Sequence, residues 1–466
     1  MKSKKDILLA FYGDDFTGST DALEFLSRAG AKTVLFLENP TEALLEQFSD
    51  LDAIGVAGMT RAMAPEEMKL VLDEAFKNLK TLSPKHIHYK VCSTFDSSPE
   101  IGNIGTAISS GVEAFNNKYT PILVAAPNLG RYAAFGNLFA RMGIGSQGAI
   151  YRLDRHPSMS KHPITPSHES DLRLHLKLQT NQSMGLIDLV DLEKPISEIN
   201  KKLDVEIQSG NKIVFFDAMY ENQMQKIGAV INASAEAGNP LFSVGSSGIE
   251  KALGDFWASK GLLKQRISWE VLDEVTHMLV LSGSVSPVTA SQINWAVLNG
   301  FEEVSVAVEA LENNTLEAQH IEAYQKQIVK HLKSGKSVIL HTSKGPEDSR
   351  FHETKAFFNK NGWSEQDIRS QTAKRFGKIL GQTARKALEQ VSVKRLVIAG
   401  GDTSSYVARE LGIMAVEMIA PVYTGAPMCR AFAPNSPVNN IEVNLKGGQV
   451  GDETYFGALQ KGIITI

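Results

Sequence analysis

Residues 7–30 read ILLAFYGDDFTGSTDALEFLSRAG, an apolar run that ends in two adjacent aspartates and leads into a stretch with helical spacing. The apolar run predicts a buried strand over Ile7–Tyr12, and the spacing predicts a helix over Thr20–Ala29. One aspartate between them would satisfy free N–H groups at the start of that helix. Two adjacent carboxylates, Asp14 and Asp15, are more than capping requires, so the pair also marks a candidate site.

The same strand–helix unit recurs through the first 150 residues. We expect further strands at Thr33–Leu37, Ala53–Ala57, His86–Val91 and Ile122–Ala126, and helices at Pro65–Leu79 and Ile104–Phe115. This alternation implies a mainly parallel sheet with helices on both faces. Residues 151–171 interrupt it with three prolines and three histidines, which predicts a long ordered loop. The pair Thr165-Pro166 is typical of a helix start, and that helix would run from Pro166 to about Leu178.

A second series of strands and helices fills the rest of the chain. Strand-like runs at residues 184–190, 212–219 and 241–248 and a helix at Glu221–Ala237 precede a polar segment, Gly254–Val275, which is the best domain boundary. The strands expected after it are Met278–Leu281, Ser305–Val308, Val338–His341, Leu396–Ala399 and Ala415–Met418. We therefore predict an α/β fold of two domains, residues 1–255 and 256–466. Each would be a mainly parallel sheet flanked by helices, with the active site in the cleft between them.

Composition narrows the class of protein. The 466 residues are 43% hydrophobic and 21% charged with a formal net charge of −4, so no polycationic surface is expected. This argues against nucleic acid or an anionic membrane as partner. The two cysteines, Cys92 and Cys429, are far apart and show no metal-site spacing. No apolar stretch approaches a membrane span, and we expect a cytoplasmic protein.

Three segments in the second half share a construction that suits phosphate binding. They read LSGSVSP at residues 281–287, AGGDTSS at 399–405 and LKGGQVG at 445–451. Glycine lets backbone N–H groups approach an anion closely, and a helix N-terminus adds unpaired donors and a favourable dipole. Such loops at strand ends of one open sheet would meet at a ligand crevice. One loop of this kind is common in α/β proteins, but three with Ser, Thr and Asp beside them favour a nucleotide.

Polar side chains gather at the expected strand ends of the first half. Asp14 and Asp15 are joined there by Thr60-Arg61, by KVCSTFDSSP starting at Lys90, by Asn128 and by Gly130-Arg131. Carboxylates accept hydrogen bonds from hydroxyls and Arg or Lys pairs with an acid group, so the mixture suits a small polyhydroxylated acid. A polar-substrate domain followed by a phosphate-loop domain indicates transfer of phosphate to a sugar hydroxyl, which needs a base near the hydroxyl and cations near the phosphates.

Two hypotheses from other classes stay open. An NAD-dependent hydroxy-acid dehydrogenase would need a dinucleotide motif, but the G-x-G-x-x-G at Gly143–Gly148 follows a helix-like segment and precedes a strand-like one. That order is the reverse of the dinucleotide-binding context. A non-catalytic ligand sensor would bind the acid without needing the polar rims of both domains.

The motifs resemble those of the four-carbon acid sugar kinase family. GDDFTGSTDAL resembles the family's opening, and GSVSPVTASQI, GGDTSSYVARELGI and LKGGQVGDETYF resemble its nucleotide loops, in the family's order over nearly the whole chain. The resemblance implies an N-terminal acid-sugar-binding domain, a C-terminal nucleotide-binding domain, and phosphorylation of four-carbon aldonates or 3-oxo acids with ATP and Mg²⁺. The expected partners are the acid sugar and ATP, with no nucleic acid and no membrane, and a homodimer stays open.

The resemblance also implies roles for individual residues. Those expected to contact ATP are Ser282, Ser284, Gly400, Gly401, Asp402, Thr403 and Gly448. Those expected at the substrate are Asp14, Asp15, Arg61, Lys90, Asp96 and Arg155. We expect Asp15 to be the general base and Asp14 to bind a hydroxyl. Asp402 is the candidate for organising Mg²⁺ or the ribose, and the metal ligands are otherwise unassigned.

The sequence departs from the family at the fourth strand. Many members read K-x-D-S-T-L-R-G there, whereas this chain reads KVCSTFDSSPEIG, with Cys92 in place of the aspartate and Asp96 in place of the arginine. Reversing a charge beside a substrate carboxylate is not conservative. Either another basic group, Arg155 or Lys161 of the long loop, holds the acid, or the substrate differs. A 3-oxo or branched five-carbon acid such as 3-oxo-isoapionate would fit the second alternative.

Overall fold

Each of the two predicted strand–helix series forms its own unit in this computed structural model, Met1–Ile267 and Ser268–Ile466. The structure describes residues 6–142, 148–162, 164–236, 238–363 and 365–465, and of residues 365–367, 369, 370 and 402 it describes the backbone alone. The predicted boundary after residue 255 falls within helix α9 (Gly248–Ser259) of the first unit. The α/β class and the mainly parallel sheets are confirmed, and the position of the active site between the units stays a prediction.

The sheet of the first unit is parallel throughout its described strands. In sheet order these are β2 (Thr33–Phe36), β3 (Ala53–Ala57), β1 (Leu9–Gly13), β4 (His86–Lys90), β11 (Leu241–Gly245), β5 (Thr120–Leu123), β10 (Ile213–Phe216) and β9 (Met184–Ile187). Its longer helices are α1 (Phe16–Ala29), α3 (Pro65–Thr81), α4 (Ile104–Phe115), α7 (Ile196–Gln208), α8 (Glu221–Ala233) and α9. The short ones are α2 (Glu42–Leu45), α5 (Leu172–Lys177) and α6 (Leu189–Leu192).

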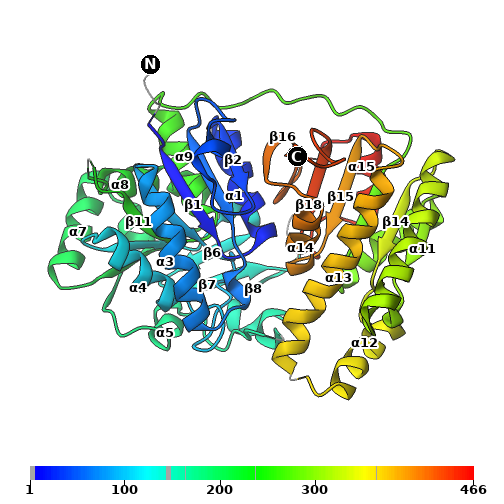
Figure 1. Ribbon diagram of the computed structural model, residues 1–466. Coiled ribbons are helices and arrows are strands. Elements are labelled where there is room, and N and C mark those ends of the chain that lie inside the picture. Colours follow the sequence, from blue (N-terminus) through cyan, green and yellow to red (C-terminus); the bar gives the residue numbers. More distant parts are fainter. Residues whose placement is uncertain (1–5, 143–147, 163, 237, 364, 466) are drawn as a thin grey trace. The chain divides into compact units, whose positions relative to one another are not determined.

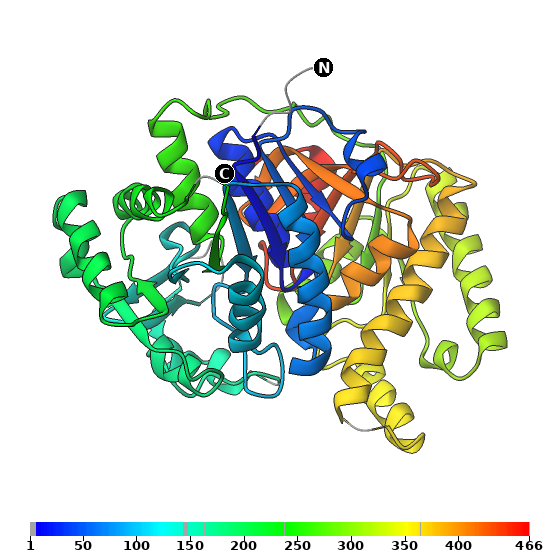
Figure 2. The same cartoon turned by 60° about the vertical axis from the view of Figure 1, so that its left-hand side comes forward.

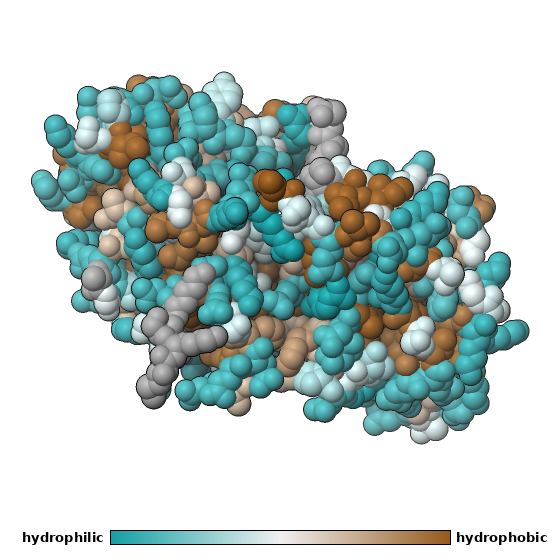
Figure 3. Space-filling model, turned by 90° about the horizontal axis from the view of Figure 1, so that it is seen from above, coloured by the Kyte–Doolittle hydropathy of each residue, from teal (hydrophilic) through white to brown (hydrophobic). Residues whose placement is uncertain are grey.

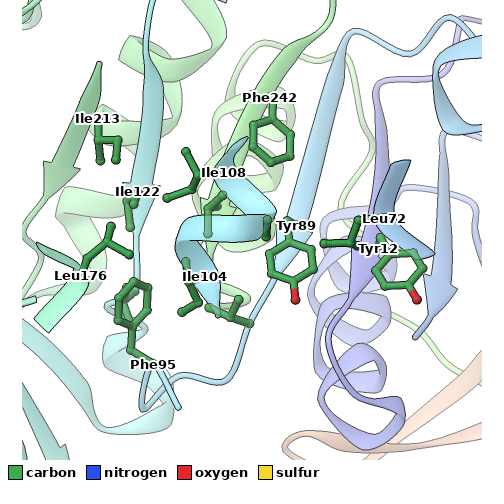
Figure 4. Packing of buried hydrophobic residues seen from close by; sticks show 14 of the residues in the cluster. Tyr12, Leu72, Tyr89, Phe95, Ile104, Ile108, Ile122, Leu176, Ile213 and Phe242 are labelled. Atoms are coloured by element: carbon green, nitrogen blue, oxygen red, sulfur yellow. The ribbon is translucent and has the colours of Figure 1, made fainter. Parts of the chain in front are cut away.

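Helices α3 and α4 lie side by side against one face of this sheet (Figures 1 and 2). Their apolar stripes meet the strand side chains in one buried cluster, which includes Tyr12, Tyr89, Ile104, Ile108 and Phe242 (Figure 4). Helix α9 packs against both α1 and α8. The helical period of 3.6 residues thus places an apolar helix face against a sheet whose strands are buried along their length.

The second unit has a mixed sheet. In sheet order its strands are β13 (Glu302–Ser305), β14 (Val338–His341), β12 (Leu279–Ser282), β15 (Arg395–Ala399), β18 (Glu442–Lys446), β17 (Ala426–Phe432) and β16 (Ala415–Tyr423). The first five are parallel, and the last two continue the sheet antiparallel. Its helices are α10 (Pro287–Leu298), α11 (Asn314–Lys333), α12 (Ser349–Lys360), α13 (Glu365–Leu388), α14 (Asp402–Glu410) and α15 (Tyr455–Lys461).

Strand order places a switch point in each sheet. In the first unit the chain leaves β1 toward β2 on one side, and it leaves β4 toward β5 on the other. In the second unit it leaves β12 toward β13 and β15 toward β16, again in opposite directions. Ligands of open α/β sheets bind outside the carboxyl ends of the strands at such points. The expected sites are therefore the loops after β1 and β4 and the loops after β12 and β15.

The structure corrects several sequence-based boundaries. The strand predicted at Ser305–Val308 is β13, which ends at Ser305, because Val308–Leu311 forms a 3₁₀ turn. The helix predicted from Pro166 is α5, which starts at Leu172 because the Asp171 carboxylate accepts from the backbone of the first turn.

A small antiparallel sheet of β6 (Arg131–Ala134), β7 (Asn137–Arg141) and β8 (Ile150–Arg152) was not predicted, although β8 is the strand-like segment expected after the G-x-G-x-x-G. The segment before the G-x-G-x-x-G is thus strand β7 and not a helix. Of that motif, residues 143–147 lie outside the described residues.

The surface seen in Figure 3 is mostly hydrophilic, with apolar residues scattered between charged ones. Such a mixture is ordinary for a folded domain. Among the described residues, no helix combines the length and the apolar character that crossing a membrane requires.

Candidate active site

Backbone hydrogen bonds join the three strand ends of the first unit that carry the predicted rim. The N–H of Asp14, just past β1, donates to the carbonyl of Lys90 at the end of β4 at 2.8 Å. The N–H of Arg61, past β3, donates to the carbonyl of Asp14 at 3.0 Å. Adjacent parallel strands in register bring their carboxyl ends to one edge, so side chains distant in sequence meet there.

One arginine holds both aspartates. Arg61 donates from Nε to Asp14 Oδ2 at 3.1 Å and from Nη2 to Asp14 Oδ1 at 2.9 Å. The same Nη2 lies 2.9 Å from Asp15 Oδ1. The two aspartates are only 3% and 6% exposed. Burial raises the pKa of Asp14 to about 6, against the opposing effect of Arg61.

Asp15 is also the N-cap of helix α1. Its Oδ1 accepts the backbone N–H of Gly18 at 2.8 Å, and its Oδ2 accepts the hydroxyl of Thr17 at 3.0 Å. Asp14 takes no part in capping. Because a carboxylate oxygen can accept two hydrogen bonds, Oδ2 of Asp15 keeps capacity for a further donor such as a substrate hydroxyl.

Lys90 lies beneath the first turn of α1 and is buried. Its Nζ is 3.1 Å from Asp21 Oδ1, and a Cβ added to Gly18 would lie 3.1 Å from that Nζ. Burial opposes its charge, but Asp21, Asp14 and Asp15 together raise the pKa of Lys90 above its usual value. A fixed positive charge therefore lies within reach of both aspartates.

A buried acid and histidine behind this rim were not predicted from the sequence. Glu250 of α9 has Oε1 at 3.6 Å from His88 Nε2, and both side chains are fully buried. Burial raises the pKa of Glu250 to about 8 and lowers that of His88 to about 3. Glu250 sits on the apolar stripe of a helix, where a carboxylate gives no motif to recognise.

The loop after β4 carries the two residues that depart from the family. Asp96 is 8% exposed, and Cys92 Sγ lies 3.0 Å from the Thr94 hydroxyl. Burial raises the pKa of the Cys92 thiol to about 12, so the thiol stays protonated at neutral pH.

The two basic groups that were expected from the long loop are both exposed. Arg155 lies 3.6 Å from Asp154, and Lys161 is on the surface. The buried Arg131, at the start of β6, is instead close enough for Asp96 to influence its charge.

Three loops meet at the switch point of the second unit. The N–H of Gly283, after β12, donates to Ala399 at the end of β15 at 3.0 Å, and the N–H of Gly400 donates to Lys446 at the end of β18 at 3.0 Å. A Cβ on Gly448 would come within 2.7 Å of Ser284 Oγ. The strand ends thus bring together the loops that the sequence singled out.

Glycine is required where these loops turn. Gly400 has φ +146°, a conformation that side chains with a Cβ rarely adopt. A Cβ on Gly401 would meet no atom within 4 Å, so its backbone borders open space. Helix α14 starts directly after it without a side-chain cap, which leaves N–H donors for an anion. The side chain of Asp402 lies outside the described residues, and Thr403 packs against Gly283.

The remaining predicted serines and a lysine lie at the same three loops, which together form the glycine–serine cradle. Ser282 and Ser284 are buried, and each hydroxyl accepts a backbone N–H of its own loop, at 3.4 and 3.2 Å. Lys446 was not predicted. Its buried Nζ donates to the Thr289 hydroxyl at 3.0 Å in the first turn of α10, and burial lowers the pKa of this lysine to about 7.

Within the described residues, no group of three or more His, Cys, Asp or Glu side chains could hold a metal ion. Mg²⁺ in phosphoryl transfer keeps several waters and binds one or two carboxylates together with substrate phosphates. Mg²⁺ that binds together with ATP therefore does not require a cluster of this kind.

Comparisons with known proteins agree with this division of the chain. A family described as "Sugar-binding N-terminal domain" matches residues 9–253, and one described as "Nucleotide-binding C-terminal domain" matches residues 279–456. The chain is 39% identical to a 3-oxo-isoapionate kinase of Paraburkholderia graminis, over 98% of this chain and 94% of that protein. It is 28% identical to a 3-oxo-tetronate kinase of Salmonella typhimurium, over 96% and 97%.

A solved structure from Salmonella typhimurium LT2 superposes on this fold with a TM-score of 0.77 at 25% identity, covering 98% of this chain and 99% of that one. The sugar-binding and nucleotide-binding matches follow each other in the order of the two units. This protein therefore belongs to the four-carbon acid sugar kinase family.

Proposed function

We propose that this protein transfers the γ-phosphoryl group of ATP to a hydroxyl of a branched 3-oxo acid sugar such as 3-oxo-isoapionate. The observation that carries the proposal is the occurrence, in one chain, of a buried Asp–Arg–Lys rim at one switch point and a glycine–serine cradle at another. The choice of a branched acid is supported by the 39% identical relative, whose name states that substrate.

In the proposed reaction the acceptor hydroxyl oxygen forms a bond to the γ-phosphorus. The bond from that phosphorus to the β–γ bridging oxygen breaks, and ADP leaves with the electron pair. The hydroxyl proton passes to a carboxylate. Asp15 is our candidate base, because Oδ2 accepts only the Thr17 hydroxyl among the described residues and faces no bidentate partner.

Asp14 and Arg61 would keep that base in place. Arg61 neutralises two adjacent carboxylates that would otherwise repel each other, so both can stay ionised near neutral pH. Asp14 is the proposed acceptor of a neighbouring substrate hydroxyl. Lys90 adds a buried positive charge beside them, which would favour the deprotonated acceptor oxygen.

ATP would bind in the second unit. The backbone N–H groups around Gly283, Gly400, Gly401 and Gly448 suit its phosphates, and the open space beside Gly401 gives room for a phosphate. Mg²⁺ would be carried by the phosphates, with Asp402 as the proposed protein carboxylate, and would neutralise charge on the transferred group. The Mg²⁺ requirement, a cytoplasmic location and a homodimer stay predictions.

The relatives are named kinases, which are phosphotransferases with an alcohol group as acceptor. Nothing supports the dehydrogenase hypothesis. It predicts a change of nicotinamide absorbance with hydroxy acids, and a sensor predicts acid binding without any turnover. Absorbance at the nicotinamide band with the same acids tests the first, and an acid-induced rise in melting temperature without ADP release tests the second.

An ADP-release assay over four- and five-carbon aldonates and their 3-oxo forms tests the proposal, with ATP-induced change of melting temperature as a second readout. We expect the highest kcat/KM for a branched 3-oxo acid and a rise in melting temperature with ATP. No ADP release from any acid, together with no thermal response to ATP, would contradict the kinase assignment.

A further inference from the structure

Several buried polar atoms of the first unit lack hydrogen-bond partners among the described residues. Two of them, Oδ1 of Asp96 and Nε of Arg131, belong to charged side chains at the edge of the sheet that carries the predicted rim. The two residues are 8% and 7% exposed; Asp96 lies on the loop that follows β4, and Arg131 begins β6, after the segment that follows β5 of the same sheet. A buried carboxylate oxygen or guanidinium N–H without a partner is destabilising, so such groups in a folded protein need an explanation.

The loop that carries Asp96 is held rigidly in a strained conformation. Phe95 has φ +58°, a left-handed conformation that is unfavourable for a bulky side chain. Its buried ring packs at centroid distances of 6.4 Å from Phe215 and 6.0 Å from His175. The Ser97 hydroxyl donates to the carbonyl of Phe95 at 3.1 Å and lies 3.0 Å from His175 Nε2. Strain maintained by packing on both sides of Asp96 is typical of a functional position.

Arg131 is fixed through one end of its guanidinium group. Nη1 donates to the carbonyls of Leu129 at 3.0 Å and Arg141 at 3.1 Å, which leaves Nε without a partner. Burial lowers the pKa of Arg131, and the negative charge of Asp96 opposes that shift, so the two groups are within electrostatic reach of each other.

The other cations of the rim already have carboxylate partners. Arg61 is paired with Asp14 and Asp15, and Lys90 is paired with Asp21. No ion pair involving Arg131 occurs in the described part of the chain. Arg131 is therefore the buried cation at this edge that remains for an anionic ligand.

We propose that Arg131 binds the carboxylate of the acid sugar and that Asp96 accepts hydrogen bonds from hydroxyl groups on the same molecule. This deepens the proposed function and rests on it. A carboxylate near the acid-binding arginine repels a second acid group on the ligand. It favours a ligand hydroxyl at that position, because a buried charged acceptor that is left unpaired is destabilising. The pair thus selects hydroxyl-rich monocarboxylates over dicarboxylates and over acids that lack a hydroxyl at this position.

Steady-state kinetics and calorimetry of acid binding without ATP test the pair in the full-length protein, with a branched 3-oxo five-carbon acid and straight-chain 3-oxo-tetronate as probes. Arg131→Gln should raise KM for both acids by about tenfold or more, with KM for ATP unchanged. Arg131→Lys keeps the charge but loses the planar donor pair, so its effect should be smaller. Asp96→Asn should lower kcat/KM for the hydroxyl-rich branched acid by about 10- to 100-fold and that for the straight acid less.

Matched controls exist in the same unit. Arg152→Gln removes an exposed arginine of the small sheet, and Asp73→Asn removes an exposed aspartate of α3. Both should leave the kinetic constants within about twofold, because surface substitutions have small effects. Melting curves of Arg131→Lys and Asp96→Asn show whether the altered proteins fold.

The proposal is overturned if Arg131→Gln and Arg131→Lys leave KM and the calorimetric affinity for both acids unchanged. It is also overturned if Arg155→Gln weakens acid binding instead, or if Asp96→Asn lowers kcat/KM equally for all acids. Acid binding that depends on Arg131 in a protein that releases no ADP would contradict the kinase assignment while supporting this pair. Normal turnover with acid binding independent of Arg131 contradicts the pair alone.

Discussion

Arg61 donates to both carboxylate oxygens of Asp14, from Nε at 3.1 Å and from Nη2 at 2.9 Å, and the same Nη2 lies 2.9 Å from Asp15. A planar guanidinium offers a rigid fork of donor nitrogens that matches one carboxylate with two hydrogen bonds and still reaches a second, whereas an ammonium offers a single point charge. The two adjacent aspartates therefore have different roles. Asp15 caps helix α1 and keeps one oxygen available, whereas Asp14 is the acid that Arg61 clamps.

Asp15→Asn should lower kcat by about 10²- to 10⁴-fold, because an amide cannot take the hydroxyl proton. Asparagine caps helices as well as aspartate does, so α1 should stay formed and KM for ATP should not change. Steady-state ADP release measures both constants. Asp188→Asn, at the N-cap of α6, is the matched control and should leave kcat unchanged. A kcat within threefold of the unaltered enzyme would exclude Asp15 as the base.

Activity should fall below about pH 6. Burial raises the pKa of Asp14 to about 6, so below that pH the acid is protonated and loses its role as acceptor for Arg61. Below about pH 6, kcat/KM should drop by up to about tenfold per pH unit. Asp14→Asn should be slower at every pH and should not show this decrease. A pH–rate profile from 4.5 to 8 with melting curves at each pH is the measurement. A flat profile down to pH 5 would contradict the role of Asp14.

The sequence alone predicts much of the fold, because the signals are local. Apolar runs such as Ala53–Ala57 and Val338–His341 are strands at the predicted positions, and the loops around Gly283 and Gly400 meet as expected. A strand buried on both faces is a continuous apolar run, which is readable without knowing its neighbours. Strands β17 and β18 were missed because β16, β17 and β18 follow one another without a helix between them, which interrupts the strand–helix rhythm.

The site is predictable where residues lie at strand ends and unpredictable where partners come from elsewhere in the fold. Arg61 and Asp14 were both candidates, but their pairing across 47 positions depends on the register of β1 and β3. The sequence placed Arg131 on the rim, but the lack of a hydrogen-bond partner at its Nε can be recognised only once the burial of the side chain is known. Glu250 stands in an apolar helix stripe, so no local pattern marks it as a buried acid.

Glu250→Gln should flatten the dependence of stability on pH. Burial raises the pKa of Glu250 to about 8, so the folded protein holds a proton that the unfolded chain releases above its usual value near 4.5. The stability that this group contributes is fully present below about pH 4.5. It is lost as the pH rises to about 8, by at most about 1.4 kcal/mol per unit.

Glutamine is neutral throughout this window and can donate to His88. The melting temperature of the variant should therefore fall less between pH 5.5 and 8 than that of the unaltered protein. Differential scanning calorimetry at both values measures the difference. Glu74→Gln, an exposed glutamate of α3, is the control and should behave as the unaltered protein. An identical pH dependence in Glu250→Gln would show that Glu250 is ionised when buried.

Gly401→Ala should weaken ATP binding with little effect on the fold. A Cβ at this position meets no protein atom within 4 Å, but φ −80° and ψ −103° lie outside the regions that alanine prefers, so the melting temperature should fall slightly. The methyl group would occupy the space that a phosphate needs, and KM for ATP should rise about tenfold. Gly448→Ala, in contrast, should raise KM for ATP and clearly lower the melting temperature, because its Cβ would displace Ser284. An unchanged KM for ATP in Gly401→Ala would show that the phosphates do not bind beside Gly401.

Lys446→Met should remove a pH-dependent step in both stability and ATP binding. Burial lowers the pKa of Lys446 to about 7, and its Nζ has one hydrogen-bond acceptor, the Thr289 hydroxyl, within the described residues. The unfolded chain therefore binds one more proton between about pH 7 and 10.5, so stability rises with pH over that range. Methionine carries no charge, and the variant should be more stable at pH 7 and less dependent on pH.

Phosphates beside Gly448 would restore the positive charge of Lys446, so ATP binding near pH 8 should take up a proton. Calorimetry in two buffers of different ionisation enthalpy measures that uptake, and ATP affinity should weaken from pH 7 to 9. Lys446→Met should show weaker binding and no proton uptake, while Lys461→Met, at an exposed position of α15, should retain both. If ATP binds Lys446→Met with unaltered affinity and proton uptake, the lysine stabilises the cradle without sensing the nucleotide's charge.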